Sequence, residues 1–276
     1  MIQRRSYKRI VLMGDLHCGH RAGRTPPRWR NRQCSEEHVW RKFTRVQEET
    51  WKLYAGFVKL LRPIDCLVVN GDLIDGRGEK SGGVELITAD RNEQVKIAEE
   101  CCEMWDAPQI VITEGTPYHA GDIESWEALI ADSLRQKGRQ VKIGAHEWVD
   151  VNGYVFDVKH HVGSSTIPHG RYTIAARDEL WNTLWHEAGL QPRADMVVRS
   201  HVHYCVGGWH YVGGKRVDFM TLPALQAMGT RWGARRMSHT VDWGLMAYDI
   251  DKHGEIVCEH RHVRTVQATA AKALRV

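Results

Sequence analysis

Five separated segments of this chain share one pattern, in which a short apolar run ends in a loop that carries Asp or His. Apolar runs of this length are typical of buried strands, whose backbone stops pairing where the strand ends. In α/β folds the side chains at the carboxyl ends of strands converge, and active sites collect there. The pattern therefore predicts an α/β fold with one polar site built from several loops. The loop residues are Asp15, His17, Asp72, Thr116, His119, His160, His161, His201 and His203.

The first half of the chain alternates strands and helices. Ser35 is followed by two glutamates, which favours a helix start because acidic side chains stabilise the first turn. Pro63 prevents that helix from continuing. The expected elements are strands at 8–13, 66–69 and 109–113 and helices at 35–61, 89–106 and 122–136.

The second half is richer in strands. The expected elements are strands at 141–149, 154–159 and 196–198 and a helix at 171–187, then short strands, and from residue 265 a short helix or a frayed end. The turn at Asn152 and Gly153 is a strong hairpin signal. Trp181 and Trp185 have helical spacing, so we expect them to pack in the core or against a sheet. The whole predicts two sheets packed face to face with helices outside, in one domain spanning 1–276.

The residue types in the five loops suit divalent metals. Asp oxygens and His nitrogens form a mixed ligand set for which we expect Mn first, with Fe, Zn, Ni and Mg as alternatives. In the D-x-H and H-x-H pairs, alternation at a strand end places both side chains on one face. Asp72 has no local His partner, so it is the candidate to bridge two ions.

These loops resemble the signature of calcineurin-like metallophosphoesterases, which runs D-x-H, G-D-x-x-[DN], G-N-H-[DE], an isolated His and G-H-x-H. The chain matches the first, second, fourth and fifth elements in order, over about residues 8–205. The resemblance implies a four-layer α/β/β/α sandwich of two mixed sheets with a dinuclear metal site. It assigns one ion to Asp15, His17, Asp72 and His203, and the second to Asp72, His201 and either His160 or His161, with strand phase favouring His160.

The third element departs from the family pattern, because the chain has GTPYH in place of GNH[DE]. Thr116 stands where the metal-binding Asn would be, and His119 comes two residues later than the family's His. We expect Thr116 or a water to replace the Asn, and the longer loop to return His119 to the catalytic position. In an alternative alignment, Tyr118 takes the Asn position directly before His119.

The resemblance implies a hydrolase of phosphate esters, in which a hydroxide bridging two cations attacks phosphorus in line. Asp72 would hold both ions, and His119 would protonate the departing oxygen. No side-chain nucleophile is required, which agrees with a sequence lacking GxSxG and P-loop motifs. A phosphodiesterase or nuclease is the leading interpretation. The alternatives are a phosphomonoesterase acting on nucleotides or proteins, and a non-catalytic metal-binding interaction scaffold.

Basic residues crowd the loop after the first motif and suggest a polyanionic substrate, nucleic acid included. Arg21, Arg24, Arg77 and His20 lie close to the matched motifs and are candidate substrate-binding residues. Trp29, inside this cluster, could stack on a base. A second basic cluster contains Arg231, Trp232, Arg235 and Arg236.

The apolar runs and the cysteines of the sequence indicate the cellular compartment of the protein. No apolar run approaches the roughly 20 residues that span a bilayer, and the seven cysteines form no CxxC pair. We therefore expect a cytoplasmic protein with reduced thiols and no membrane partner. The net charge of +4 is too small to identify a partner, and the sequence leaves the oligomeric state open.

Overall fold

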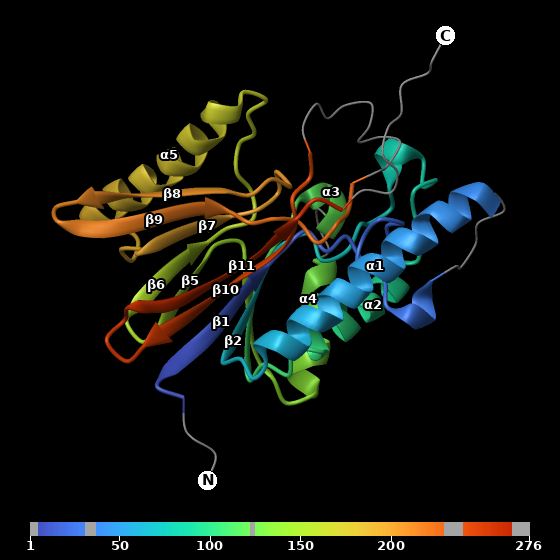
Figure 1. Ribbon diagram of the computed structural model, residues 1–276, viewed down its shortest axis with the longest axis horizontal. Coiled ribbons are helices and arrows are strands. Elements are labelled where there is room, and N and C mark those ends of the chain that lie inside the picture. The colour runs from blue at the N-terminus through green and yellow to red at the C-terminus, as the bar shows by residue number, and fades with distance from the viewer. Residues whose placement is uncertain (1–4, 31–36, 122–124, 229–239, 267–276) are drawn as a thin grey trace.

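The larger of two β-sheets has six strands in the order β11-β10-β1-β2-β3-β4 (Figure 1). In the computed structural model, which describes residues 5–30, 37–121, 125–228 and 240–266, strands β1 to β4 run parallel to one another. Strands β10 and β11 add an antiparallel edge. The strands are β1 (Tyr7–Met13), β2 (Cys66–Asn70), β3 (Gln109–Thr113), β4 (Gln140–Gly144), β10 (Trp243–Asp251) and β11 (Ile256–Arg264).

The second sheet has five strands in the order β5-β6-β7-β9-β8. Its centre, β6-β7-β9, is parallel, and β5 and β8 pair antiparallel at the edges. The strands are β5 (Glu147–Val151), β6 (Tyr154–Val158), β7 (Met196–Arg199), β8 (Val206–Val212) and β9 (Lys215–Thr221). Both sheets are therefore mixed.

Helices cover the outer face of each sheet. Helices α1 (Glu37–Leu61), α2 (Arg91–Glu103) and α4 (Trp126–Gln136) lie on the six-stranded sheet, and α5 (Pro168–Glu187) lies on the five-stranded sheet (Figure 1). The short α3 (Pro117–Ala120) lies beyond the end of β3. The expected four-layer α/β/β/α sandwich is confirmed. No helix of the described residues is long and apolar enough to cross a membrane.

Alternation along β1 explains how one strand serves two cores. Ile10 and Leu12 belong to the core between the two sheets, with Phe156 from β6. Val11 and Met13 point the other way, into the core beneath the helices. Because successive side chains of a strand point to opposite faces, an unbroken apolar run is what a strand buried on both faces requires.

Most strand and helix expectations match the structure, and one strand does not. The strand expected at 109–113 is observed as β3 with the same bounds. The strand expected at 141–149 is wrong, because β4 and β5 are separate and belong to different sheets. The chain turns sharply after Gly144, where a side-chain Cβ would lie 2.3 Å from Glu147 Oε1. The apolar pattern continues across this break, so the sequence does not reveal it.

The tryptophans of α5 also differ from expectation. Trp181 and Trp185 face solvent, with 51% and 43% of their surface exposed, and do not pack against the sheet. The inward face of α5 instead carries Glu179 and Asn182, both buried. Helical spacing predicted one apolar stripe correctly, but it could not say which side of the helix faces the protein.

Candidate metal centre

The predicted ligands come from strand ends in both sheets. In four of the five loops, the first candidate ligand follows the last strand residue by two positions. Asp15 and Asp72 follow β1 and β2 of the larger sheet, and His160 and His201 follow β6 and β7 of the smaller one. The parallel strands of each sheet therefore deliver these side chains to one end of the sandwich, where they meet.

The backbone at these loops is strained. Asp15, His17, Asp72, His201 and His203 all have positive φ, between 44° and 72°. Residues other than glycine rarely adopt this region, although Asp and His do so more readily than most. Conformations of this kind persist where the surrounding structure enforces them, and they cluster at functional sites.

Asp15, His17 and His203 form the first group. Asp15 Oδ1 lies 3.1 Å from His203 Nε2 and 3.8 Å from His17 Nε2. The two imidazole Nε2 atoms are 3.2 Å apart. One oxygen and two nitrogens therefore face a common point, as ligands of a single cation would.

Asp72, His160 and His201 form the second group. His160 Nε2 lies 3.1 Å from Asp72 Oδ2, and the rings of His160 and His201 are 5.4 Å apart. His161 is exposed and contacts His201 from outside, with ring centroids 4.9 Å apart. The geometry therefore favours His160 over His161 as the member of this group.

Asp72 lies between the two groups. Its Oδ2 faces His160 on one side and lies 4.0 Å from His17 Nε2 on the other. Its Oδ1 accepts hydrogen bonds from the Thr116 N–H at 2.7 Å and from the Thr116 hydroxyl at 3.1 Å. This carboxylate therefore lies between the two groups, and Thr116 fixes its orientation.

Neighbouring acceptors set which nitrogen of each histidine can bind a cation. His17 Nδ1 donates to Asp75 Oδ1 at 2.9 Å, and His160 Nδ1 donates to the Asn70 carbonyl oxygen at 2.7 Å. In its neutral form, each ring therefore turns an unprotonated Nε2 toward the carboxylates. Such partners are common behind metal-binding histidines because they fix the tautomer.

Two buried atoms of the site have no hydrogen-bond partner. Asp15 Oδ1 and His160 Nε2 each lie near an opposite group, yet neither contact has hydrogen-bond alignment. Leaving such atoms unsatisfied costs about 1–3 kcal/mol each. A cation bound at each group would satisfy them, so the residues present fit a pair of divalent metals.

The electrostatics of the site favour positive charge. Burial opposes protonation of the histidines, but Asp15 and Asp75 outweigh it and raise the pKa of His17 to about 10. Asp72 likewise raises the pKa of His160 to about 9. Burial, with His160 nearby, lowers the pKa of His201 to about 4 and keeps that ring neutral, as a metal ligand must be.

Helix α3 brings His119 to the first group. The ring of His119 packs edge-on against His17, with centroids 4.6 Å apart, and its Nδ1 donates to the Asp75 carbonyl oxygen at 2.8 Å. Pro117 begins this single turn, and Thr116 precedes it. The two extra residues of GTPYH are thus absorbed in a helical turn that returns His119 toward the site.

Sequence reasoning missed two supports of the centre. Glu127 of α4 accepts hydrogen bonds from Leu73 N–H at 2.9 Å and Gly115 N–H at 2.7 Å, and so holds together the loops on either side of Asp72. Asn70 donates to Ser200 Oγ at 2.8 Å and thereby joins the two sheets beneath the site. Asn70 directly precedes a recognised motif, but Glu127 has no local signal.

The candidate substrate-binding residues differ in burial, and therefore in their access to a substrate. Arg24 cannot contact a substrate, because it is fully buried and donates to the Thr50 carbonyl oxygen at 2.7 Å. His20 is also buried, with Nδ1 accepting from Ala22 N–H at 3.0 Å. Arg21 is half-buried, and Arg77 is exposed beside the second motif. Only Arg21 and Arg77 therefore keep the expected access to a substrate.

The basic loop is also less available than its composition suggests. Arg28 contacts Glu100 at 2.7 Å, and Arg30 contacts Glu48 at 3.8 Å. Trp29 is buried and donates to Glu100 Oε2 at 3.1 Å, so it cannot stack on a base. The second basic cluster, Arg231, Trp232, Arg235 and Arg236, lies outside the described residues.

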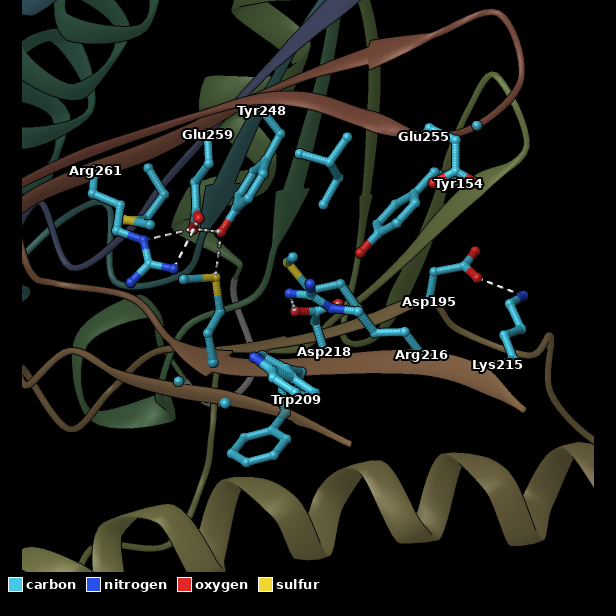
Figure 2. Close-up of a pocket in the computed structure, with 18 of the residues that line it drawn as sticks. Tyr154, Asp195, Trp209, Lys215, Arg216, Asp218, Tyr248, Glu255, Glu259 and Arg261 are labelled. Carbon is cyan, nitrogen blue, oxygen red and sulfur yellow. Dashed lines mark hydrogen bonds and ion pairs between the residues drawn. The ribbon is translucent and has the colours of Figure 1, made fainter. Parts of the chain in front are cut away.

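A cavity of about 690 Å³ opens elsewhere, between the sheets where β10 and β11 face β8 and β9 (Figure 2). Figure 2 shows Tyr154, Tyr248 and Trp209 in its walls. The charged side chains there pair with one another, as Arg216 does with Asp218. None of the loop residues described above lines this cavity, so it is separate from the metal centre.

No family model and no curated protein matches the chain. Among solved structures, an archaeal phosphodiesterase is similar at 14% identity and a TM-score of 0.44, covering 93% of this chain and 99% of its own. The sulfate thiohydrolase SoxB from Thermus thermophilus is similar at 11% identity and a TM-score of 0.42, covering 96% and 58%.

Proposed function

We propose that this chain is a dinuclear metal-dependent hydrolase of phosphate esters, as its resemblance to calcineurin-like metallophosphoesterases implies, and that it prefers phosphodiesters. The placement of Asp72 carries the proposal. One of its oxygens is held by Thr116, and the other is directed between two groups of buried ligands, with His160 3.1 Å away and His17 4.0 Å away. A single bridging carboxylate between two mixed Asp and His groups is what a pair of cations sharing one substrate oxygen needs.

Two divalent cations, when bound, supply the Lewis acidity that activates water and neutralises charge on phosphoryl oxygens. The chain holds their ligands in place: Asp75 and Asn70 fix the rings of His17 and His160, and Thr116 fixes Asp72. This preorganisation matters because electrostatic stabilisation depends on groups that need not rearrange during the reaction.

His119 is the residue placed to handle the proton of the leaving group. Its Nδ1 donates to the Asp75 carbonyl oxygen, so Nε2 is the atom left to exchange a proton: it would accept one from water to give the imidazolium and then pass it to the departing oxygen. The side chain is 18% exposed, against 4% for His17, and therefore lies at the edge of the centre that a substrate can reach. A positioned general acid contributes about 10²–10⁴ in rate.

The small number of accessible cations among the described residues near the centre supports a diester. A phosphomonoester carries about 1.5–2 negative charges at neutral pH, whereas a diester carries one. Among the described residues near the motifs, Arg24 is buried, and Arg28 and Arg30 are paired with glutamates. Among the described residues beside the motifs, Arg77 is thus exposed and Arg21 is half-buried. So few accessible guanidinium groups suit a single diester group better than a monoester dianion or a long nucleic-acid backbone.

The test is hydrolysis of bis-p-nitrophenyl phosphate and p-nitrophenyl phosphate by metal-stripped protein titrated with Mn²⁺. We expect Mn-dependent turnover, faster with the diester, and loss of turnover in Asp72→Asn. Asp132→Asn, which changes an exposed carboxylate on α4, is the matched control and should be unaffected. Faster turnover of the monoester would overturn the diester preference. Failure to bind metal at all would overturn the dinuclear hydrolase.

A further inference from the structure

Helix α5 turns a largely polar face toward the protein and an apolar face outward, which is the reverse of the usual orientation. Its buried residues are Ala175, Glu179 and Asn182. Its outward face carries four large apolar side chains that are each about half exposed: Leu180, Trp181, Leu184 and Trp185. Figure 1 shows α5 as the outermost layer over β7, β8 and β9, and no described element covers its outer side. A surface helix normally turns such a stripe inward.

Polar contacts on the inward face fix the rotation of the helix. Glu179 Oε2 lies 2.6 Å from His210 Nε2 of β8. Asn182 donates to Asp157 Oδ2 of β6 at 3.1 Å, and its carbonyl accepts from Ala194 N–H at 3.0 Å. Turning the tryptophans toward the sheet would leave these buried groups without partners, which is costly. The apolar stripe therefore stays on the outside of the isolated chain.

The stripe is self-complementary. If two copies of α5 packed antiparallel about a two-fold axis centred between residues 182 and 183, Trp181 would lie against Leu184 of the partner subunit. In the same arrangement Leu180 would lie against Trp185 of the partner subunit. Each large ring thus meets a smaller side chain, as close helix packing requires.

Charges flank the stripe in a matching way. Arg177 lies one turn before the apolar patch and Glu187 lies at its far end, and both are exposed. Neither has an ion pair among the described residues. In the antiparallel arrangement Arg177 comes beside Glu187 of the partner subunit, and the symmetry repeats this pair at the other end.

The area is adequate for a modest dimer. Aromatic side chains bury about 150–250 Å² each, so the two half-exposed tryptophans offer about 200 Å², and the two half-exposed leucines add a smaller area. Specific interfaces begin at about 1,200 Å² in total, or about 600 Å² on each copy, so the flanking residues of the same face would complete the interface. A single chain seldom exposes a contiguous apolar patch larger than a few hundred Å², and patches of that size often mark interaction sites.

We propose that the outward face of α5, formed by Leu180, Trp181, Leu184 and Trp185, is the interface of a homodimer with antiparallel helices. The partner is a second copy of this chain, because the patch and its flanking charges complement themselves. The proposal is independent of the metal centre, and Trp181→Glu should leave metal binding unchanged.

Sedimentation velocity of the full chain tests the proposal, from about 1 to about 100 µM, where an interface of this size is expected to associate. We expect the mass to rise from 31.6 kDa toward twice that value. Trp181→Glu should weaken the dimer at least about tenfold, as loss of a central aromatic typically does. The matched control is Leu60→Glu, which alters an exposed leucine on α1 and should leave the dimer intact.

Charge reversal then tests the antiparallel geometry. Arg177→Glu should weaken the dimer about threefold, as expected for an exposed ion pair, and adding Glu187→Arg in the same chain should restore it. A wild-type chain that stays monomeric throughout the range overturns the proposal, and binding to lipid vesicles lost in Trp181→Glu would then assign the face to a membrane surface. A dimer that is unchanged by Trp181→Glu also overturns it. Circular dichroism of each variant establishes that the fold is retained.

Discussion

The hydroxyl of Thr116 offers the most selective test of how the metal centre is held. It donates to Asp72 at 3.1 Å, beside a stronger contact from the Thr116 N–H at 2.7 Å. Thr116→Val removes the hydroxyl and keeps both the shape of the side chain and the N–H. A hydrogen bond to a charged group contributes about 1.5–3 kcal/mol. Because the N–H already holds the same oxygen, the lower value applies, which corresponds to about a tenfold weaker metal affinity.

Isothermal titration of metal-stripped protein with Mn²⁺ measures this effect directly. Thr116→Ser keeps the hydroxyl and its hydrogen bond to Asp72. It should therefore bind Mn²⁺ with an affinity within about twofold of the wild type, because the support behind the ligand is unchanged. An affinity of Thr116→Val within that same range would refute the positioning role. Complete loss of one of the two ions would instead make Thr116 a direct ligand in place of the family's Asn.

Three further results are expected. His119→Ala should lower turnover by about 10²–10⁴ with metal content unchanged, and unchanged turnover in a rate assay would remove His119 from the reaction. Arg24→Ala should lower the free energy of unfolding, measured in urea, by about 2–4 kcal/mol through lost packing and hydrogen bonds, and should leave KM unchanged. Arg77→Ala should raise KM and leave the free energy of unfolding unchanged. A raised KM in the Arg24 variant would contradict its buried placement. Although burial alone would raise the pKa of Asp157, the paired Arg199 and His146 lower it, so this carboxylate stabilises the fold above about pH 4 and loses that effect as pH falls through its lowered pKa. Urea unfolding at pH 3 and pH 7 should therefore differ less for Asp157→Asn than for the wild type.

The strand ends of the site were predictable from the sequence because two independent signals coincide at each of them. An apolar run that must be buried stops, and a residue able to bind metal follows within two or three positions, as Asp72 follows β2. Distant partners carry no such mark. Glu127 supports the centre from a helix more than 50 residues after Asp72, and its neighbours in sequence resemble those of any helix. The inverted α5 was unpredictable for a related reason, since periodicity defines a stripe and tertiary contacts decide which way it faces.

The basic loop shows the limit of composition as a guide to substrate. A cluster of arginines indicates a polyanion only if the guanidinium groups are free. Arg24 is instead buried beneath α1, where burial lowers its pKa to about 10, and its guanidinium lies 5.7 Å from the centre of the Tyr54 ring. Its neighbours Arg28 and Arg30 pair with glutamates. The acidic partners are distant in sequence, so the neutralisation is visible only in the fold.

The strained loops weigh against a scaffold that binds no metal. Five candidate ligand positions adopt positive φ, at a cost of order 1–3 kcal/mol each, and the sum approaches the whole net stability of a typical domain. The glycines around them are needed for the same reason. A Cβ at Gly71 would lie 2.3 Å from His160 Nδ1, and one at Gly115 would lie 2.3 Å from Asp72 Oδ1. These glycines therefore allow three loops to approach closely enough for one carboxylate to reach both ligand groups. A scaffold that needed only the surface of the fold would gain nothing from this strain, whereas two bound cations would offset it by satisfying Asp15 Oδ1 and His160 Nε2.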